Sequence, residues 1–521
     1  MLFNSFPFIL AFLPLTLAGF FALGRRHPAA AAAWLTGASI FFYGWWNPRY
    51  VALLTASILF NYVLGLLIAR TADQGRPGRR KQWLAIAVVA NLALLGYYKY
   101  ANFFLDEVGG LVGSPWHLGE IILPLGISFF TFTQISFLVD TYRGEAREYN
   151  LIHYALFVTY FPHLIAGPIL HHQEMMPQFE RRGTYRPDLE NVVVGLMIFS
   201  IGLFKKVVIA DTAGVFSTPI FDAAAGGASP SFSGAWGGAL AYTFQLYFDF
   251  SGYSDMAIGL SRMFGIDLPL NFNSPYKATS IIDFWRRWHM TLSRFLRDYL
   301  YFPLGGGRAG TVRRYVNLMI AMLLGGLWHG AGWTFVVWGG IHGLYLIVNH
   351  GWRALRHRLG YDPGAPTWAG GHGARTLTFL AVVVGWVFFR ASSLDAARRI
   401  LEGMAAMHGF ALPDSYAQAV LILPLVPVMA DLGWPVDPLA LLLLLGGALL
   451  ALVWWAPNTQ ELMGRYSTAL DPYPGGTRTR PPGWLEWRLT PLMAMLTGLI
   501  LFLSLLALIT ETPSEFLYFQ F

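Results

Sequence analysis

Long apolar segments recur along the whole chain and alternate with short polar connections. A helix of about 20 apolar residues crosses a hydrocarbon layer about 30 Å thick, so most of these segments predict membrane-spanning helices. Some are short or rich in glycine, and we expect about eleven to thirteen true spans in an all-α polytopic fold. The apolar windows are 2–24, 29–46, 50–69, 83–98, 121–139, 152–170, 190–210, 234–260, 315–328, 334–349, 376–389, 416–430, 438–456 and 488–509.

Composition supports a membrane protein. The 521 residues are 55% hydrophobic and 12% charged, with a mean hydropathy of +0.47, whereas soluble proteins carry about twice that charged fraction. Segment 2–24 lacks a basic leader and a small-residue cleavage site, so we interpret it as a retained span. No long hydrophilic domain or internal repeat interrupts the spans, which indicates one membrane domain, 1–521, with its richest polar content at about 240–350.

The more polar insertions are expected to be connections between spans. Two of them contain Gly-Pro-rich pieces typical of surface loops, Asp362-Pro-Gly-Ala-Pro-Thr and Asp471-Pro-Tyr-Pro-Gly-Gly. The insertions are 70–82, 171–189, 211–233, 353–375, 457–487 and a central block, 261–314.

Basic residues in the first loops predict the orientation. Arg25 and Arg26 separate the first two windows, and loop 70–81 carries five basic residues against Asp73. The loop between the second and third windows offers only Arg49. Because basic loops remain in the cytoplasm, we expect the N-terminus to lie outside. The net charge of +7 then indicates anchoring beside anionic lipid, and no basic patch supports nucleic-acid binding.

The chain contains no cysteine. This excludes disulfides, thiolate metal sites and acyl-cysteine intermediates. Any acyl chemistry would need another protein nucleophile, or none.

The central block is the passage richest in candidate chemistry. It contains Asn271-Phe-Asn-Ser-Pro-Tyr276, which should not form regular helix before its proline. It continues through Ile282-Asp-Phe-Trp-Arg-Arg-Trp-His-Met-Thr-Leu-Ser-Arg to Tyr301. On one continuous helix His289 and Ser293 would share a face, flanked by Arg286 and Arg297. Tryptophan and arginine together suit a helix at or dipping into the membrane interface, and irregular backbone there suggests a polar chamber.

A second candidate is Trp328-His329-Gly330, which closes the apolar run 318–327. An imidazole at the end of such a run needs polar partners, so ionisable groups there are functional candidates. On the residues alone, His329 and His289 are more readily explained as hydrogen-bonded packing residues. His342 follows after another apolar run and is a weaker candidate.

Taken together, these motifs resemble the membrane-bound O-acyltransferase family, and within it the membrane subunits of alginate O-acetyltransferases. Matching pieces run through most of the chain. They are Leu123-Pro-Leu-Gly-Ile-Ser-Phe-Phe-Thr-Phe, Gly167-Pro-Ile, Tyr247-Phe-Asp-Phe-Ser-Gly-Tyr-Ser-Asp, Phe284-Trp-Arg-Arg-Trp-His-Met-Thr-Leu-Ser, Asp298-Tyr-Leu-Tyr, Trp328-His-Gly and Phe516-Leu-Tyr-Phe-Gln-Phe.

The resemblance implies a many-helix fold around a tunnel across the membrane. It implies that His329 is the catalytic histidine and that His289 matches a second one, where eukaryotic relatives often carry asparagine. An imidazole, with an unperturbed pKa of about 6.5, can take the proton of an attacking hydroxyl near neutral pH.

The donor is expected to be acetyl-CoA from the cytoplasm, as a substrate with no permanently bound cofactor. Its phosphates need cationic partners, and lipid headgroups are an equal alternative for the same side chains. The candidates are Arg286, Arg287, Arg294, Arg297 and Arg308. The expected partners are periplasmic acetyltransferase subunits that pass the acetyl group to an exported polysaccharide, most plausibly alginate.

Other readings stay open. Asp249 and Asp255 are expected to pair with arginines or cap helices, with a smaller chance of touching the reaction. His163, His171 and His172 could suggest a metal, but adjacent histidines chelate one ion poorly and no carboxylate set accompanies them, so we expect none. Cellulose, another exopolysaccharide or a D-alanylated wall polymer are alternative acceptors. A polysaccharide transporter or a scaffold without chemistry remains a different class.

Overall fold

The computed structural model describes residues 1–114, 116–148, 150–308, 310–360, 368–421, 437–470, 486–510 and 516–517. Within these residues the chain is helical, and extended pairing is limited to one bridge between Pro269 and Leu470. The chain forms two compact units. Unit 1 comprises 1–203, 253–270 and 459–520, and unit 2 comprises 204–252, 271–458 and 521.

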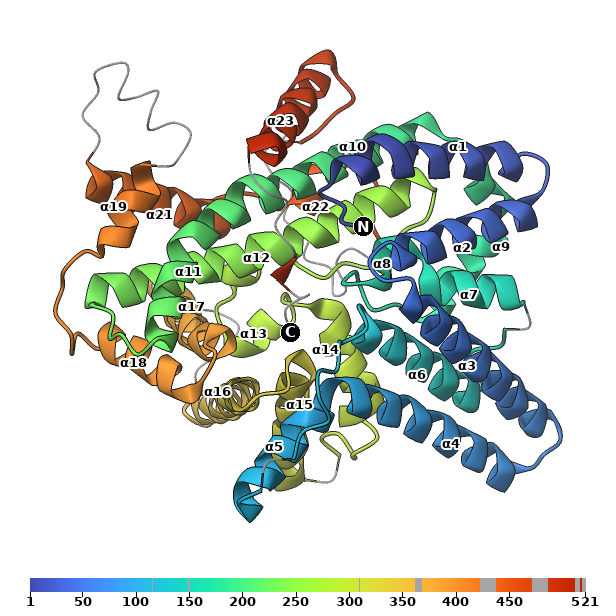
Figure 1. The fold of residues 1–521 in the computed structure, drawn as a ribbon, viewed down its shortest axis with the longest axis horizontal. Helices are drawn as coiled ribbons and strands as arrows, with labels where there is room; N and C mark the ends of the chain where they lie inside the picture. Colours follow the sequence, from blue (N-terminus) through green and yellow to red (C-terminus); the bar gives the residue numbers. More distant parts are fainter. Residues whose placement is uncertain are drawn as a thin grey trace. The chain divides into compact units, whose positions relative to one another are not determined.

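Unit 1 holds the first helices of the chain and the last one (Figure 1). Its elements are η1 (Pro7–Phe12), α1 (Leu13–Gly24), α2 (Pro28–Gly44), α3 (Arg49–Asp73), α4 (Pro77–Leu95), η2 (Gly96–Tyr100), α5 (Ala101–Val112), α6 (Ile127–Arg143), α7 (Leu151–Thr159), α8 (Phe161–Leu164), α9 (His172–Glu180), η3 (Arg182–Tyr185), α10 (Leu189–Phe204, whose last residue belongs to unit 2), α22 (Thr459–Leu462) and α23 (Pro491–Thr510).

Unit 2 contains the central block and the helices that follow it. Its elements are η4 (Lys205–Ala210), α11 (Asp211–Ala225), α12 (Phe232–Met263, which ends in unit 1), η5 (Pro275–Lys277), α13 (Ile281–Trp285), α14 (Met290–Leu296), η6 (Arg297–Tyr301), α15 (Thr311–His329), α16 (Trp333–Arg358), α17 (Trp368–Arg390), α18 (Leu394–Met404), α19 (Asp414–Leu421) and α21 (Pro438–Trp455).

Local sequence explains many helix boundaries. Pro28 and Pro77 occupy the first position of α2 and α4, where a missing backbone N–H costs nothing. Gly126 and Gly144 flank α6 with φ of 70° and 83°, a conformation that glycine adopts without steric penalty. Asn150 caps α7, because its side chain accepts hydrogen bonds from the backbone N–H groups of the first turn.

Seven helical stretches in the described residues are long and apolar enough to cross a membrane. This confirms an all-α, multi-pass membrane protein, and the count of eleven to thirteen spans stays a prediction. The stretches are Pro7–Gly24, Arg49–Asp73, Pro77–Val112, Leu189–Ala225, Ala369–Arg390, Pro438–Trp455 and Pro491–Ile509.

Two sequence predictions were wrong in detail. Window 152–170 is not one span, because α7 ends at Thr159, Pro162 lies in the short α8, and Gly167-Pro168 is not helical. Segment 211–233 is not simply a polar connection, because α11 extends the helix of window 190–210 through the π-helical turn η4. The proposed loop pieces at 362–367 and 471–476, most of window 416–430, and residues 518–521 of the C-terminal motif lie outside the described residues.

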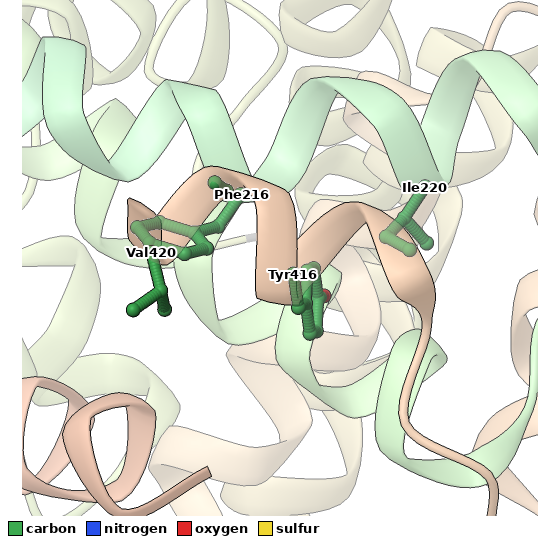
Figure 2. Packing of buried hydrophobic residues seen from close by; sticks show 5 residues of the cluster. Phe216, Ile220, Tyr416 and Val420 are labelled. Atoms are coloured by element: carbon green, nitrogen blue, oxygen red, sulfur yellow. The ribbon is translucent and has the colours of Figure 1, made fainter. Parts of the chain in front are cut away.

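Aromatic and aliphatic side chains pack α11 against α19 in unit 2 (Figure 2). Phe216 and Ile220 of α11 contact Tyr416 and Val420 of α19. The Tyr416 hydroxyl donates a hydrogen bond to the carbonyl of Gly234 at 3.0 Å, which satisfies its polar end inside an apolar cluster.

The helices α15 and α16 form a hairpin whose backbones approach closely (Figure 1). A Cβ atom at Gly326 would collide with the Phe335 carbonyl, and one at Gly339 would collide with the Met322 carbonyl. Small residues permit this approach, as they do between other membrane helices. The hairpin thereby fixes Trp328-His329, which end α15.

Candidate active site

His329 is the last residue of α15 and is enclosed by aromatic rings of unit 2. Only 4% of it is exposed. Its ring lies edge-on to Trp338, with centroids 5.2 Å apart, and close to Phe389 at 5.1 Å. The next residue, Gly330, has no room for a Cβ, because the Phe335 ring occupies that space. The site is therefore dry and tightly shaped, which strengthens electrostatic interactions with a reacting group.

His289 is fully buried and lies at a break between two helices. The prediction of one continuous helix through 282–301 was wrong, because α13 ends at Trp285 and α14 begins at Met290. His289 itself adopts a left-handed backbone conformation, with φ of 42°. Non-glycine residues adopt it at an energetic cost, and such strain is concentrated at functional sites.

The non-helical segment 271–274 holds His289 in place. As predicted, residues 271–274 are not helical. The backbone N–H of Met290 donates to the carbonyl of Asn271 at 2.9 Å. The Asn271 side-chain oxygen accepts from the Thr291 hydroxyl at 2.6 Å and lies 3.3 Å from His289 Nδ1.

This arrangement selects one tautomer of His289. With Asn271 Oδ1 as the acceptor, the proton lies on Nδ1, and Nε2 carries the lone pair. Burial lowers the pKa of His289 to about 3, because desolvation penalises the imidazolium. The ring is thus a neutral hydrogen-bonding group throughout the physiological range.

The two histidines belong to one site. Their ring centroids are 6.5 Å apart with an interplanar angle of 58°, and Trp328 lies near both, at 6.1 Å from His289 and 4.9 Å from His329. Phe250 closes the other side of His289, edge-on at 4.8 Å. At this separation both imidazoles can face one reacting group.

The five candidate arginines differ in their partners. Arg287 pairs with Asp283 at 2.8 Å, and Arg297 pairs with Asp298 at 2.7 Å. Arg286 and Arg308 are exposed and Arg294 is half-buried. Their role in donor binding stays a prediction, although compensated charges such as that of Arg297 attract an anion less strongly.

His342 belongs to the same aromatic cluster as His329. Trp338 lies between them, 4.9 Å from His342 and 5.2 Å from His329. A Cβ at Gly385 would be 2.8 Å from His342 Nε2, so glycine leaves the space that this ring occupies.

The acidic candidates have distinct partners. Asp249 forms an ion pair of 2.6 Å with Lys206, which also contacts Asp211 at 2.9 Å. In unit 1, Asp255 accepts a hydrogen bond from the Thr459 hydroxyl at 2.6 Å. Sequence analysis missed Lys206, although a lysine inside an apolar window was a visible signal.

The histidines of unit 1 are dispersed among separate partners. His163 contacts the Phe157 carbonyl at 2.7 Å, His171 faces Asp140 at 3.8 Å, and His172 faces Glu148 at 3.6 Å. Among the described residues no three metal-ligating side chains of the His, Cys, Asp or Glu types converge.

Sequence reasoning also missed the residues that orient the histidines. Asn271 and Thr291 lie inside the motifs that drew attention, yet their pairing across twenty residues is a tertiary contact. Trp338 and Phe389 carry no signal that separates them from ordinary apolar residues of a span.

Comparisons with known proteins identify the family of this chain. A sequence model of the membrane-bound O-acyltransferase family matches residues 40–382, which include both His289 and His329. The chain is 46% identical over 441 residues to a peptidoglycan O-acetyltransferase of Helicobacter pylori, covering 79% of this chain and 81% of that protein. It is 39% identical to the probable alginate O-acetylase AlgI of Pseudomonas aeruginosa over the full length of both.

A more distant relative is the teichoic acid D-alanyltransferase of Lacticaseibacillus rhamnosus, 27% identical over 58% of this chain and 80% of that protein. The family match covers well over half of the chain, and two relatives exceed 30% identity across most of it. The multi-pass helical fold agrees with this family match. This chain belongs to the membrane-bound O-acyltransferase family.

Proposed function

We propose that this enzyme is an O-acetyltransferase of the bacterial inner membrane that takes acetyl from cytoplasmic acetyl-CoA and passes it on for O-acetylation of an exported polysaccharide. The observation that carries the proposal is the pair of buried imidazoles, His289 and His329, 6.5 Å apart inside an aromatic enclosure. His289 is neutral and is oriented by Asn271, which suits a group that supports proton transfer during acyl transfer.

The reaction needs one base and one proton donor. The acceptor oxygen attacks the thioester carbonyl carbon, an O–C bond forms, and the C–S bond breaks. His329 takes the hydroxyl proton and returns it to the leaving thiolate, so the overall reaction releases CoA thiol with no net proton. The neutral His289 orients the acceptor hydroxyl, whose hydrogen bond Nε2 accepts, and the surrounding rings keep out water that would hydrolyse the thioester.

Two acceptors are supported by different relatives. Alginate is our first choice, because the relative that aligns over its whole length is named an alginate O-acetylase. Peptidoglycan is the second, because the relative named a peptidoglycan O-acetyltransferase is more identical over a shorter span. Both are exported polysaccharides with free hydroxyl groups, so the chemistry is the same.

The polymer lies outside the membrane, whereas acetyl-CoA is cytoplasmic. We therefore infer periplasmic acetyltransferase partners that complete the transfer, and an N-terminus that faces the periplasm. Family membership favours this enzyme over the transporter and scaffold alternatives.

The test is incubation of the purified enzyme with acetyl-CoA that is labelled in its acetyl group. Each polymer is tested with and without a candidate periplasmic acceptor protein. We expect label to leave CoA only when an acceptor is present. The His329→Ala variant, inserted at normal abundance, should be about 10² to 10⁴ times slower, as expected for loss of a general base. Equal activity per folded molecule in His329→Ala would remove the catalytic assignment.

A further inference from the structure

Four basic side chains gather at the ends of α15 and α16 that lie away from His329. Arg314 is in the first turns of α15, and its Nη2 atom lies 2.8 Å from Nδ1 of His350 on α16. Arg353 follows His350 by one turn on α16. Arg286 directly follows α13, which packs against α16. We call Arg286, Arg314, His350 and Arg353 the basic cluster.

The positive charges of the basic cluster are not compensated within the part of the chain that the structure describes. None of its three arginines forms an ion pair with a described carboxylate, in contrast to Arg287 with Asp283 and Arg297 with Asp298. Like charges at short range repel one another unless an anion lies between them. Arg314 in contact with His350, with Arg353 one turn further along α16 and Arg286 next to α13, therefore indicates a place for an anionic group.

The field at the cluster is strong enough to act on His350. Its pKa is lowered to about 4, first by burial and then by the positive charges of Arg314, Arg353 and Arg286. The N-terminus of α15 adds the positive end of a helix dipole, where a cation such as Arg314 is unfavourable and an anion is favoured.

The approach to the cluster is built from glycine. Gly305, Gly306 and Gly310 precede α15 with φ of 104°, 57° and 93°, a conformation that glycine adopts without steric penalty. Gly307 lies beside Arg314, because a Cβ there would be 3.6 Å from Arg314 Cδ. Glycine at these positions leaves room for an oxyanion near the helix N-terminus.

The cluster and the histidine pair lie at opposite ends of one hairpin. Arg314 and His329 are separated by fifteen residues of the continuous helix α15, which corresponds to about 22 Å at 1.5 Å per residue. Along α16, Trp338 and His342 are about one turn apart and lie on one side of the helix. This suits a ligand with a phosphate at one end and its reactive group far away, as in an acyl thioester of a phosphopantetheine.

We propose that Arg286, Arg314, His350 and Arg353 bind the phosphate groups of the acyl donor and set its thioester beside His329. This inference rests on the proposed function. It assigns Arg314, His350 and Arg353 to donor binding and, of the five arginines suggested by sequence, retains Arg286. An anionic lipid headgroup offers the same phosphate chemistry, so the experiment separates the two sources.

The first measurement compares two donors in detergent-purified enzyme, acetyl-CoA and S-acetyl-pantetheine, which lacks every phosphate. For Arg314→Gln and Arg353→Gln we expect kcat/KM for acetyl-CoA to fall about ten- to a hundredfold, mainly through KM, as for a lost charge-assisted hydrogen bond. With S-acetyl-pantetheine the same variants should equal the parent. Arg398→Gln is the matched control, because Arg398 is exposed on α18 and paired with Asp395.

A second measurement does not depend on turnover. Binding of CoA alone to the purified protein, followed by calorimetry, should weaken in Arg314→Gln and recover in part in Arg314→Lys, with unchanged size-exclusion profiles. If the parent binds CoA but transfers no acetyl, and CoA binding is weaker in Arg314→Gln, the result would support the cluster and reject the proposed function. Unchanged CoA binding, or an equal loss with both donors, would overturn the inference.

The lipid arm uses vesicles of phosphatidylcholine with and without phosphatidylglycerol. We expect phosphatidylglycerol to change the acetyl-transfer activity of the variants and of the parent equally. If the variants bind CoA normally and lose only the response to phosphatidylglycerol, the cluster binds lipid and the inference fails.

Discussion

At the scale of single residues, the site depends on how His289 is held. Its left-handed backbone, the Met290 bond to Asn271 and the Asn271–Thr291 pair together fix one ring orientation and one tautomer. A rigid, neutral imidazole needs no charge change to take part in the reaction. That property decides which substitutions it should tolerate.

We expect His289→Ala to lower acetyl transfer strongly, by about 10²-fold, and His289→Asn to lower it less, because an amide can still form hydrogen bonds. The double variant with His329→Ala should be little slower than His329→Ala alone, since groups that act as a unit are not additive. The measurement is initial rate per folded molecule. Additive losses would mean that the two histidines act independently.

The same burial predicts a pH effect on stability. His289 has a pKa of about 3 in the folded protein and about 6.5 when unfolded. Below about pH 6.5 the unfolded chain binds a proton that the folded protein does not, so stability falls as pH falls, by up to about 1.4 kcal/mol per pH unit. Replacing the ring in His289→Asn removes this contribution. Thermal unfolding between pH 7 and pH 4.5 should show a shallower decline in the variant than in the parent, and parallel declines would contradict the prediction.

A second residue-scale prediction concerns the buried ion pair of unit 2. Lys206 is 3% exposed and contacts two carboxylates, those of Asp211 and Asp249. Lys206→Met leaves both acids without this partner in an apolar span, which should cost about 3–5 kcal/mol of stability. Adding Asp249→Asn should recover part of the loss, because one buried charge is removed. Half-life of the purified protein at fixed temperature tests this, and a double variant no better than the single one would argue against charge as the cause.

At the scale of elements, the α15–α16 hairpin is the part that brings the chemistry together. Its glycines allow backbone contact, and that contact positions His329 against Trp338 and separates the basic cluster from the histidines by the length of a helix. A second element of note is the π-helical turn η4, which lies in the span Leu189–Ala225 and includes Lys206. Such turns are uncommon and often accompany functional positions.

Two neighbouring glycines of α16 give a matched test of the hairpin. Gly339→Ala would place a Cβ against the Met322 carbonyl, a backbone atom that cannot move aside, whereas Gly340→Ala would place one 3.5 Å from a Leu323 methyl group. We expect Gly339→Ala to lose most activity and about 1–3 kcal/mol of stability through overpacking, and Gly340→Ala to remain near the parent. Similar behaviour of both variants in activity and unfolding assays would show that the close contact is unimportant.

At the scale of the whole molecule, the outcome of folding is a chain with large apolar surfaces that only lipid can cover. In α21, Leu443 and Leu444 are more than 60% exposed, as expected for side chains that face hydrocarbon. Such surfaces tell us that helices cross the membrane. The direction in which they cross comes from the basic loops.

The absence of cysteine from the sequence makes that direction directly measurable. We expect Gly75→Cys, in the basic loop after α3, to react with a thiol reagent that enters the cell and to resist an impermeant one. Leu2→Cys should react with both. Gly75 has no atom within 4 Å of the position where a Cβ would lie, although its φ is positive, so Gly75→Ala serves as the folding control. Labelling of Gly75→Cys by the impermeant reagent in intact cells would reverse the orientation.

Much of the architecture could be predicted from the sequence because hydrophobic patterning is local. Seven apolar stretches became membrane-length helices, and the helical class followed from them. The failures occurred where a proline or a left-handed residue interrupts an apolar or amphipathic pattern, at Pro162 and at His289. A break of this kind is stabilised by contacts with distant segments, so periodicity does not reveal it.

By itself, the sequence determined that this is a multi-pass α-helical membrane protein, and its motifs singled out His289 and His329 as candidate residues. Both follow from short stretches of chain, because apolar length and an imidazole in an apolar context are local properties. Only the tertiary structure decided that Asn271 orients His289, that Trp338 lies between His329 and His342, and that Arg314 meets His350 across a hairpin. These contacts join residues from 4 to 36 positions apart. Their geometry depends on close packing of helices, and the chemistry of each side chain alone does not specify it.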